Sequence, residues 1–257
     1  MKNPPGDFIW YELMTTDADG AQTFYSSVIG WRINYAQHEG MDYQLFYAGE
    51  SGIGGMMQLD EEMIANGTRP GWIAYVAVDD VDVTSAAATA AGGSVMVPPT
   101  EIPNVGRFAM LGDPGGVPIY VLSTINDEPS KSYAPQSDGH CAWNELVSSD
   151  QDAAIKFFTG LFDWQLGDAI PIGPLGTYQM LNLNDRPVSA IMQAGPDGSG
   201  PMWRHYFRVA SLKDAIAAVE AGGGKVLHGP QPVPGDDEII IGMDPQGAIF
   251  SLVAKKD

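Results

Sequence analysis

The sequence is short of basic residues. Only 13 lysines and arginines stand against 32 aspartates and glutamates, which gives the 257-residue chain a formal net charge of −19. Such a surface repels phosphate backbones and anionic lipid headgroups, so we expect neither nucleic-acid binding nor membrane-surface binding. The charge could attract a cationic ligand, although an ordinary solvated acidic surface is the simpler explanation.

Cysteine and long apolar runs are also scarce. Cys141 is the single cysteine, so no intramolecular disulfide can form, which fits a reducing compartment. Residues 1–6 contain no apolar run of the signal-peptide type, and no apolar stretch reaches membrane-spanning length. The sequence also lacks a P-loop, a Gly-x-Ser-x-Gly elbow and a Cys-x-x-Cys pair. We therefore expect a soluble cytoplasmic protein without a bound cofactor.

The sequence contains an internal repeat. The segment Gly6–Leu13 matches Gly139–Leu146, and the offset of 133 continues without a gap as far as Trp31 and Trp164. Both halves also end in an Asp-Pro-x-Gly motif, at residues 113–116 and 244–247. This order and spacing indicate a duplication. We predict a first domain over residues 1–123, a linker over 124–138 and a second domain over 139–257.

Each half is expected to contain two βαβββ modules. Alternating and aromatic segments predict strands, and the apolar stripe after Asp17 predicts a helix that Gly30 ends. The Ala-rich run 80–91 and the run 212–221 predict two further helices, each followed by glycines. The predicted fold class is α+β. The strands of the first half are expected at residues 8–15, 31–35, 43–48, 53–58, 72–78, 94–97, 106–111 and 117–122.

These features resemble the vicinal oxygen chelate superfamily, which includes glyoxalases, bleomycin resistance proteins and extradiol dioxygenases. The resemblance is carried by Glu12-Leu13-x-Thr15-x-Asp17, by Phe24-Tyr25 and Gly30-Trp31, by the run 76–82, by the glycines after residue 91 and by the motif at 113–116, each set occurring twice. It is closest to tandem two-domain glyoxalase-like proteins. In that family, two modules face each other and their curved sheets enclose a small-molecule cleft.

Metal-dependent members of the family place one ligand on each of four strands of the cleft. In the first half the corresponding positions hold Trp10, the pair Met56-Met57, Ile73 and Tyr120. In the second half they hold Trp143, the pair Ile191-Met192, Arg204 and Ser251. Zinc, iron and manganese need imidazole or carboxylate ligands, which these residues do not supply. His205 lies one position from the expected site, but the other expected positions would still supply no metal ligand. The resemblance therefore implies that neither half holds the family's metal in the family's way.

The alternation of strand residues predicts which side chains line each cleft. The first cleft would be lined by Trp10, Glu12, Met57, Ile73, Tyr75 and Tyr120. The second, more polar cleft would be lined by Trp143, Glu145, Arg204, Tyr206, Arg208 and Ser251. Because the two sets differ, we expect the two sites to have different roles, with the more apolar first cleft as the small-molecule site.

Glu12 and Tyr120 are the candidate catalytic residues. A carboxylate surrounded by aromatic side chains should have a raised pKa, and Glu12 could act as a general base or as the counter-charge of a cationic ligand. Alternatively, Glu12 binds the backbone or a tyrosine and only shapes its strand. Tyr120 could donate to a substrate oxygen or simply pack, and Glu145 could form an ion pair with Arg204 or Arg208.

The remaining candidates have structural alternatives as well. Trp10 and Trp143 could stack on a planar ligand, or could fill the space of a lost metal site. The run Asp79-Asp80-Val81-Asp82 resembles a metal motif but better suits the start of a helix. Cys141 is expected to be a packed thiol.

Three functions fit the sequence. The first is a metal-free binding protein that sequesters a small, cationic or aromatic organic molecule. The second is a glyoxalase-like lyase, isomerase or related enzyme that uses Glu12 or Tyr120 in place of a metal. The third is a non-catalytic scaffold with closed clefts. The ligand's identity, a monomeric or homodimeric state, and the pairing of modules within or across the halves stay open.

Overall fold

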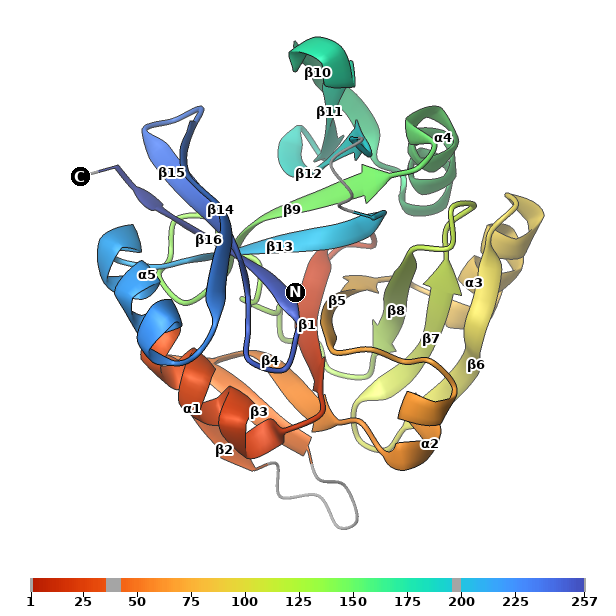
Figure 1. The fold of residues 1–257 in the computed structure, drawn as a ribbon. Coiled ribbons are helices and arrows are strands. Elements are labelled where there is room, and N and C mark those ends of the chain that lie inside the picture. Colours follow the sequence, from red (N-terminus) through yellow and green to blue (C-terminus); the bar gives the residue numbers. More distant parts are fainter. Residues whose placement is uncertain (1, 36–42, 196–199, 257) are drawn as a thin grey trace. The chain divides into compact units, whose positions relative to one another are not determined.

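The computed structural model describes residues 2–35, 43–195 and 200–256, and the four predicted βαβββ modules are present (Figure 1). The first consists of β1 (Phe8–Thr15), α1 (Ala18–Val28), β2 (Arg32–Tyr35), β3 (Tyr43–Ala48) and β4 (Ser51–Gln58). After α2 (Glu61–Ala65), the second consists of β5 (Gly71–Ala77), α3 (Val81–Ala90), β6 (Ser94–Ile102), β7 (Gly106–Gly112) and β8 (Pro118–Thr124).

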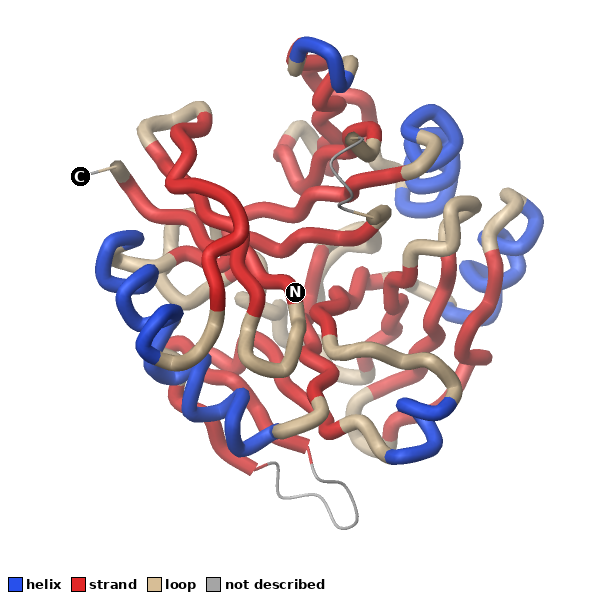
Figure 2. Tube along the Cα trace, viewed as in Figure 1, coloured by secondary structure: helices blue, strands red, loops and turns tan. Residues whose placement is uncertain are grey.

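The second half repeats this order. Its first module consists of β9 (Cys141–Ser148), α4 (Gln151–Phe162), β10 (Gln165–Pro171), a short 3₁₀ turn η1 (Gly173–Leu175), β11 (Thr177–Leu183) and β12 (Arg186–Gln193). Its second consists of β13 (Met202–Arg208), α5 (Leu212–Ala221), β14 (Lys225–Val233), β15 (Asp237–Met243) and β16 (Ile249–Lys255). The α+β fold class is confirmed, and the tube drawing shows that strands dominate it (Figure 2).

The helices begin at the side chains that the sequence indicated. Asp17 Oδ1 accepts a hydrogen bond from the Gly20 amide at 3.0 Å at the start of α1, and Asp80 caps α3 in the same way. Such caps satisfy amide groups that have no partner inside the helix. Gly30 follows α1 with a φ of 84°, a left-handed conformation that glycine adopts without strain.

The described residues divide into two compact units. Unit 1 comprises residues 1–9, 74–130 and 144–203, and unit 2 comprises residues 10–73, 131–143 and 204–257. Unit 1 thus combines the second module with the third, and unit 2 combines the first with the fourth. Modules therefore associate across the halves within each compact unit.

Each unit contains two groups of hydrogen-bonded strands. In unit 2 their orders are β2-β3-β4-β1 and β13-β16-β15-β14, and in unit 1 they are β5-β8-β7-β6 and β10-β11-β12-β9. The pairs β1–β4 and β5–β8 are parallel, whereas β3–β4 and β7–β8 are antiparallel, so the sheets are mixed. Within unit 2, α1 lies against α5, and within unit 1, α3 lies against α4 (Figure 1).

Aromatic side chains dominate the two cores. In unit 2, Trp31 stacks on Phe46 with 4.9 Å between ring centroids and meets Phe207 edge-on at 5.0 Å. In unit 1, the indole nitrogen of Trp164 donates to the Gly6 carbonyl at 2.9 Å. Buried aromatic pairs of this kind stabilise a core beyond the area that they bury. Trp31 and Trp164 occupy matching positions of the repeat, so each core contains a tryptophan at the same point of its module.

Some elements differ from the sequence prediction. Strand β6 continues to Ile102, past the prolines at 98 and 99, because it is an edge strand whose free side does not need amide donors. Helix α2 and the turn η1 were not predicted. In unit 2, the segment 131–143 contains the fully buried Ser132, and Tyr133 forms a bridge with Cys141.

Candidate functional site

Strand β1 carries the sharpest candidate residues and alternates as predicted. Tyr11 and Leu13 are fully buried, whereas Trp10 and Met14 on the opposite face are partly exposed. Glu12 shares that face and keeps 5% of its surface exposed. Burying a carboxylate is costly unless it accepts hydrogen bonds, so its partners decide what it can do.

Glu12 accepts a hydrogen bond from a tyrosine that the sequence analysis did not select. The hydroxyl of Tyr43 donates to Glu12 Oε2 at 3.1 Å and accepts from the indole nitrogen of Trp10 at 2.9 Å. We call these three side chains the Trp10–Tyr43–Glu12 network. The indole N–H thus donates to the hydroxyl, and the hydroxyl donates to the carboxylate, so the two hydrogen bonds form a chain. A hydrogen bond between Glu12 and a tyrosine was one of the contacts that the sequence analysis considered for this residue. The same tyrosine hydroxyl also fixes the orientation of the Trp10 indole.

A glycine permits this network. Gly55 pairs with Glu12 in the β1–β4 register, and the Tyr43 ring lies directly over it. A Cβ atom at position 55 would lie 2.5 Å from the ring and hydroxyl of Tyr43, far inside van der Waals contact. The sequence signal for Tyr43 was its recurrence as Tyr178 in the second half, which alone does not indicate contact with Glu12.

Further aromatic and sulfur side chains share this face in unit 2. Met57 is partly buried and pairs with Tyr43 in the β3–β4 register, and Tyr47 pairs with Gly52. The Arg32 guanidinium lies over the Tyr47 ring, 4.4 Å from its centroid. A planar cation therefore already stacks on an aromatic ring at the edge of this face.

The other residues predicted for the first cleft belong to both units. Ile73 is buried in unit 2, whereas Tyr75 and Tyr120 belong to unit 1. There the two tyrosine rings stack with 4.3 Å between centroids and an interplanar angle of 17°, and Tyr120 is 6% exposed. Phe108 meets the Tyr120 ring at 5.8 Å. Tyr120 is thus a packed residue, although its hydroxyl still gives it a polar end.

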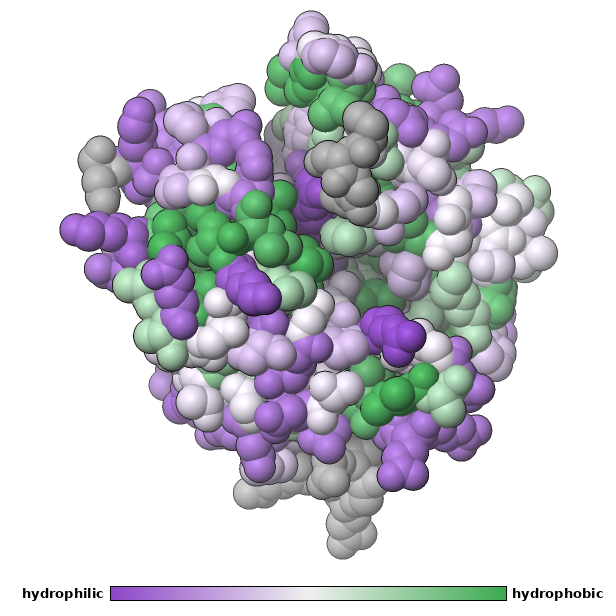
Figure 3. Space-filling model, viewed as in Figure 1, coloured by the Kyte–Doolittle hydropathy of each residue, from purple (hydrophilic) through white to green (hydrophobic). Residues whose placement is uncertain are grey.

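Two predicted residues of the second half lie in an apolar cluster of unit 2. Tyr206 is buried with Ile239 and Val253, and Trp143 packs against them. Ser251 is fully buried, and its hydroxyl has no hydrogen-bond partner among the described residues. Figure 3 shows hydrophobic side chains gathered over β14, β15 and β16. Tyr206 and Trp143 of this predicted site therefore lie among apolar side chains of unit 2.

The charged candidates of the second half lie on two strands. Glu145 lies on β9, and Arg204 and Arg208 lie on β13. Arg208 is buried and binds both carboxylate oxygens of Asp237, at 3.2 and 2.6 Å, together with the Pro135 carbonyl at 2.6 Å. Arg208 on β13 therefore pairs with Asp237 on β15, and the pairing of Glu145 with Arg204 stays a prediction.

Two cavities in the described part of the chain have linings that include no residue of the Trp10–Tyr43–Glu12 network. One, of about 270 Å³, is in unit 2 and is lined by Gln136, Asp138, Arg208, Val209, Ala210 and Lys255. Another, of about 180 Å³, is in unit 1 beside the start of α3. In the first cavity, Arg208 already binds Asp237 and the Pro135 carbonyl, and neither lining includes an aromatic face beside a carboxylate, so the aromatic face of unit 2 stays the candidate site.

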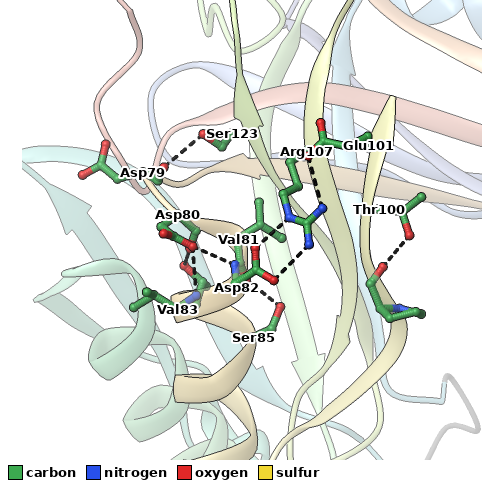
Figure 4. Close-up of polar contacts among 12 residues, drawn as sticks. Asp79, Asp80, Val81, Asp82, Val83, Ser85, Thr100, Glu101, Arg107 and Ser123 are labelled. Carbon is green, nitrogen blue, oxygen red and sulfur yellow. Dashed lines mark hydrogen bonds and ion pairs between the residues drawn. The ribbon is translucent and has the colours of Figure 1, made fainter. Parts of the chain in front are cut away.

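The acidic run at residues 79–82 is a helix start, as predicted (Figure 4). Asp80 Oδ1 accepts from the amides of Asp82 and Val83 at 2.9 and 3.0 Å. Asp82 binds Arg107 through both oxygens, at 2.7 and 3.0 Å, and this hydrogen-bonded pairing lowers the pKa of the Asp82 carboxyl. The run therefore supplies a cap and an exposed ion pair.

Two buried side chains near β1 are held in their neutral forms. Burial raises the pKa of the Cys141 thiol to about 12, and its sulfur donates to the Trp143 carbonyl at 3.2 Å. Burial lowers the pKa of His205 to about 3, and its ring meets the Tyr11 ring at 5.1 Å. The thiol is thus packed and unreactive, as predicted, and the imidazole stays uncharged.

The sequence analysis missed a buried polar network in unit 2. The Tyr25 hydroxyl donates to Asp244 Oδ2 at 2.9 Å and accepts from the indole nitrogen of Trp72 at 3.0 Å. Asp244 Oδ1 also accepts from the amide groups of Gln246 and Ala248, at 3.0 and 2.8 Å. Burial raises the pKa values of both Tyr25 and Asp244. This Tyr25–Asp244 network joins α1 to the turn before β16.

The described residues contain no group of three or more histidine, cysteine, aspartate or glutamate side chains placed to hold a metal ion. The positions that carry the family's ligands hold Trp10, Ile73 and Tyr120 in the first half. Indole and aliphatic groups are not metal ligands, and a neutral buried phenol is a poor one. The residues present therefore do not fit the metal of the metal-dependent relatives.

Comparison with known proteins establishes the family. The sequence profile described as Glyoxalase/Bleomycin resistance protein/Dioxygenase superfamily matches residues 8–121 and again residues 139–252. The chain belongs to this superfamily. The two matches also agree with the duplication found in the sequence.

The relatives span nearly the whole chain. A Mycobacterium tuberculosis protein named "Putative glyoxylase CFP32" is 30% identical over 254 residues, covering 95% of this chain and 93% of the relative. "Anthracycline biosynthesis protein DnrV" of Streptomyces peucetius is 24% identical over 266 residues, covering 98% and 94%.

Solved structures show the same fold. The Mn(II)-bound glyoxalase from Novosphingobium aromaticivorans has a TM-score of 0.67 at 18% identity and covers 99% of this chain and 83% of its own. The 2,3-dioxygenase LapB from Pseudomonas sp. KL28 has a TM-score of 0.64 at 14% identity, covering 99% and 92%. Over the described part of the chain, no helix has the length and hydrophobicity needed to cross a membrane.

Proposed function

We propose that this protein binds a small organic molecule without a metal, on the aromatic face of β1, β3 and β4, and thereby sequesters or detoxifies it. The observation that carries the proposal is the Trp10–Tyr43–Glu12 network, in which a partly exposed indole is held beside a buried carboxylate. An oriented indole offers a stacking surface, and the carboxylate offers a counter-charge. The proposed ligand is therefore aromatic and cationic.

The net charge of the chain and the name of one relative support this ligand class. The net charge of −19 raises the local concentration of cations at the protein surface. One relative is named for the biosynthesis of anthracyclines, which are planar aromatic compounds. The absence of metal-ligating groups at Trp10, Ile73 and Tyr120 supports binding by stacking and charge rather than by coordination.

The test is a tryptophan-fluorescence titration with three probes: an anthracycline aminoglycoside, its uncharged aglycone, and ethidium. We expect the two cationic probes to quench the wild-type protein. Trp10→Phe should remove most of the quenching, because the stacking indole is the reporter. Glu12→Gln should weaken binding of the cationic probes about ten- to hundredfold and leave the aglycone unchanged, because a hydrogen-bonded charge contributes about 1.5–3 kcal/mol.

The repeat supplies matched controls. Trp143→Phe and Glu145→Gln make the same changes at the corresponding positions of the second half, and both should bind the probes as the wild type does. Absence of quenching by all three probes would refute the proposed ligand class. Loss of binding in the second-half variants alone would refute the assignment to the first half.

An enzymatic role is the second candidate, and the relative named as a glyoxylase favours it. In this alternative, Glu12 would act as a general base on an aldehyde substrate, because it lies on the same face as the proposed ligand. Turnover can be followed by NMR with methylglyoxal and a thiol. Glu12→Gln should abolish it, and an unchanged rate in this variant would exclude Glu12 as the base.

A further inference from the structure

The two cavities occupy corresponding places in the two halves of the chain. The unit 1 cavity, of about 180 Å³, is lined by Gly6 and Val78, and the Gly6 amide donates to the Ala77 carbonyl at 2.8 Å. Beside the unit 2 cavity, of about 270 Å³, the Gly139 amide donates to the Arg208 carbonyl, also at 2.8 Å. Gly139 and Arg208 are the repeat counterparts of Gly6 and Ala77. The same backbone contact therefore borders both cavities, and both derive from one place of the repeat.

The unit 1 cavity is acidic. The charged side chains among its described lining residues are those of Asp79, Asp80 and Asp163. Figure 4 shows Asp79 and Asp80 together at the start of α3. Three carboxylates beside one small cavity repel a negatively charged molecule, so this copy is not suited to an anionic ligand.

The unit 2 cavity differs in charge at the matching positions. Arg208 and Lys255 line it, whereas their counterparts in the first half are an alanine and a threonine. The counterpart of Asp79 is the uncharged Ala210. Asp138 shares the lining with the two cations. The unit 2 cavity therefore offers two positive groups and one negative group to a ligand.

The guanidinium of Arg208 is fixed in place and keeps donors for a ligand. It donates through Nε to the Pro135 carbonyl at 2.6 Å, and through its two terminal nitrogens to the Asp237 carboxylate at 3.2 and 2.6 Å. These contacts use three of the five N–H groups of an arginine side chain, which leaves one on each terminal nitrogen. Only 7% of the side chain is exposed, so an acceptor in the cavity would satisfy a buried donor.

Lys255 supplies the uncompensated positive charge of the cavity. It is the cross-strand partner of Asp237 in the β15–β16 register, but it is exposed and forms no ion pair within the described part of the chain. The Arg208 charge is already balanced by Asp237, so the ammonium of Lys255 attracts an anion. The acidic surface elsewhere opposes this attraction little, because physiological salt screens charges beyond about 8 Å.

We propose that the unit 2 cavity binds a small organic monocarboxylate that carries a hydroxyl or ammonium group beside its carboxylate. One carboxylate oxygen accepts from an unused N–H of Arg208, and the other lies at the Lys255 ammonium. The adjacent hydroxyl or ammonium group donates to Asp138, which disfavours a second negative charge on the ligand. Drug-sized ligands occupy pockets of roughly 300–1,000 Å³, so this smaller cavity fits a molecule of a few carbon atoms. The site is independent of the aromatic face of β1, β3 and β4.

A ¹H–¹⁵N NMR titration of the full-length protein at constant ionic strength tests the site. The probes butyrate, 2-hydroxybutyrate and 2-aminobutyrate share one carbon chain and differ only at the second carbon, and phosphate is the inorganic control. We expect the amide signals of Asp138, Val209 and Ala210 and the Nε signal of Arg208 to shift saturably with the two substituted acids. Butyrate should bind about two- to tenfold more weakly, because it offers Asp138 no donor. Phosphate should also bind more weakly, because its second charge is repelled.

Two substitutions at exposed positions change the charge of the cavity and leave the Arg208–Asp237 pair intact. Lys255→Ala removes the free cation, and Ala210→Asp introduces the residue that the first half has at position 79. Each should weaken 2-hydroxybutyrate binding about two- to fivefold, as expected for exposed charge pairs, and the double variant roughly tenfold. Asp79→Ala makes the reciprocal change in the unit 1 cavity. It is the matched control and should bind this probe as the wild type does.

Three results would overturn the proposal. The first is the absence of saturable shifts with both substituted acids up to about 50 mM, well above the millimolar Kd expected for so small a ligand. The second is phosphate binding more tightly than either substituted acid, which would exclude the carboxylate assignment. The third is equal affinity in the double variant and the wild type. Unmoved amide signals outside the cavity would show that the variants are folded.

The titration also separates this site from the proposed function. Carboxylate binding without binding of any cationic aromatic probe would support the unit 2 cavity and refute the proposed ligand class of the aromatic face. Binding of the cationic probes without any carboxylate-induced shift would support the proposed function and refute the unit 2 site.

Discussion

Tyr25→Phe tests the buried network that joins α1 to the turn before β16. The substitution keeps the ring, which packs against Phe24, Trp31 and Trp72, and removes only the hydroxyl. That hydroxyl donates to the buried Asp244 carboxylate and accepts from the partly buried Trp72 indole. A hydrogen bond to a charged group contributes about 1.5–3 kcal/mol, and an indole left without an acceptor adds to the loss. We expect the free energy of unfolding to fall by about 2–4 kcal/mol.

Urea denaturation measures this loss, and Tyr35→Phe is its matched control. The Tyr35 hydroxyl also donates to an aspartate, Asp19, at 3.2 Å, but Tyr35 is 60% exposed. Water replaces an exposed partner, so this variant should lose less than about 0.5 kcal/mol. Equal midpoints for Tyr25→Phe and the wild type, at equal denaturant slopes, would show that burial does not strengthen the network and would refute the reasoning.

The difference in free energy of unfolding between the wild type and Tyr25→Phe should depend on pH. Burial raises the folded-state pKa of Asp244 above 3.8, so the folded protein binds this proton more tightly than the unfolded chain. The group therefore contributes stability that is fully present below pH 3.8 and is lost as the pH rises through the folded-state pKa. Because Tyr25 lowers that pKa, the stability gap between wild type and Tyr25→Phe should narrow on acidification through this window. A gap independent of pH would contradict the assignment.

Two further predictions concern buried groups. Cys141, whose thiol pKa burial raises to about 12, should react with a disulfide reagent at pH 8 only after the protein is unfolded, and prompt stoichiometric labelling of the native protein would contradict this. Arg208→Met leaves the Asp237 carboxylate without its bidentate partner and should lower the free energy of unfolding by about 3–5 kcal/mol in a urea titration. The double variant with Asp237→Leu should recover part of that loss, and a further loss would argue against the ion pair.

Local patterns predicted the modules, and distant contacts limited the prediction of the site. Asp17, Asp80 and the glycines mark helix ends through interactions within a few residues, so the sequence locates them well. The role of Tyr43 depends on Gly55 across a strand pair, which periodicity does not reveal. The Arg208–Asp237 pair was not predicted, because strand alternation indicates the face of a residue but not which side chain of another strand it contacts.

The Tyr25–Asp244 network shows the same limit at a greater separation. The sequence gives Tyr25 a place in the apolar stripe of α1 and Asp244 a place in a repeated turn, and both placements are correct. Their contact joins the first module to the fourth, across 219 positions of the chain. Only the association of modules across the halves brings them together, and the sequence left that association open.

The composition of the two units bears on how a single half would behave. A polypeptide cut at residue 130 would hold the first module without the fourth and the second without the third, so each piece would carry two incomplete cores. In particular, α1 would lose α5, and the Tyr25 hydroxyl would lose its carboxylate. An unduplicated ancestor with this packing would have to take the missing modules from a second copy of itself. On this reasoning the duplication turned an exchange of modules between two polypeptides into an exchange within one.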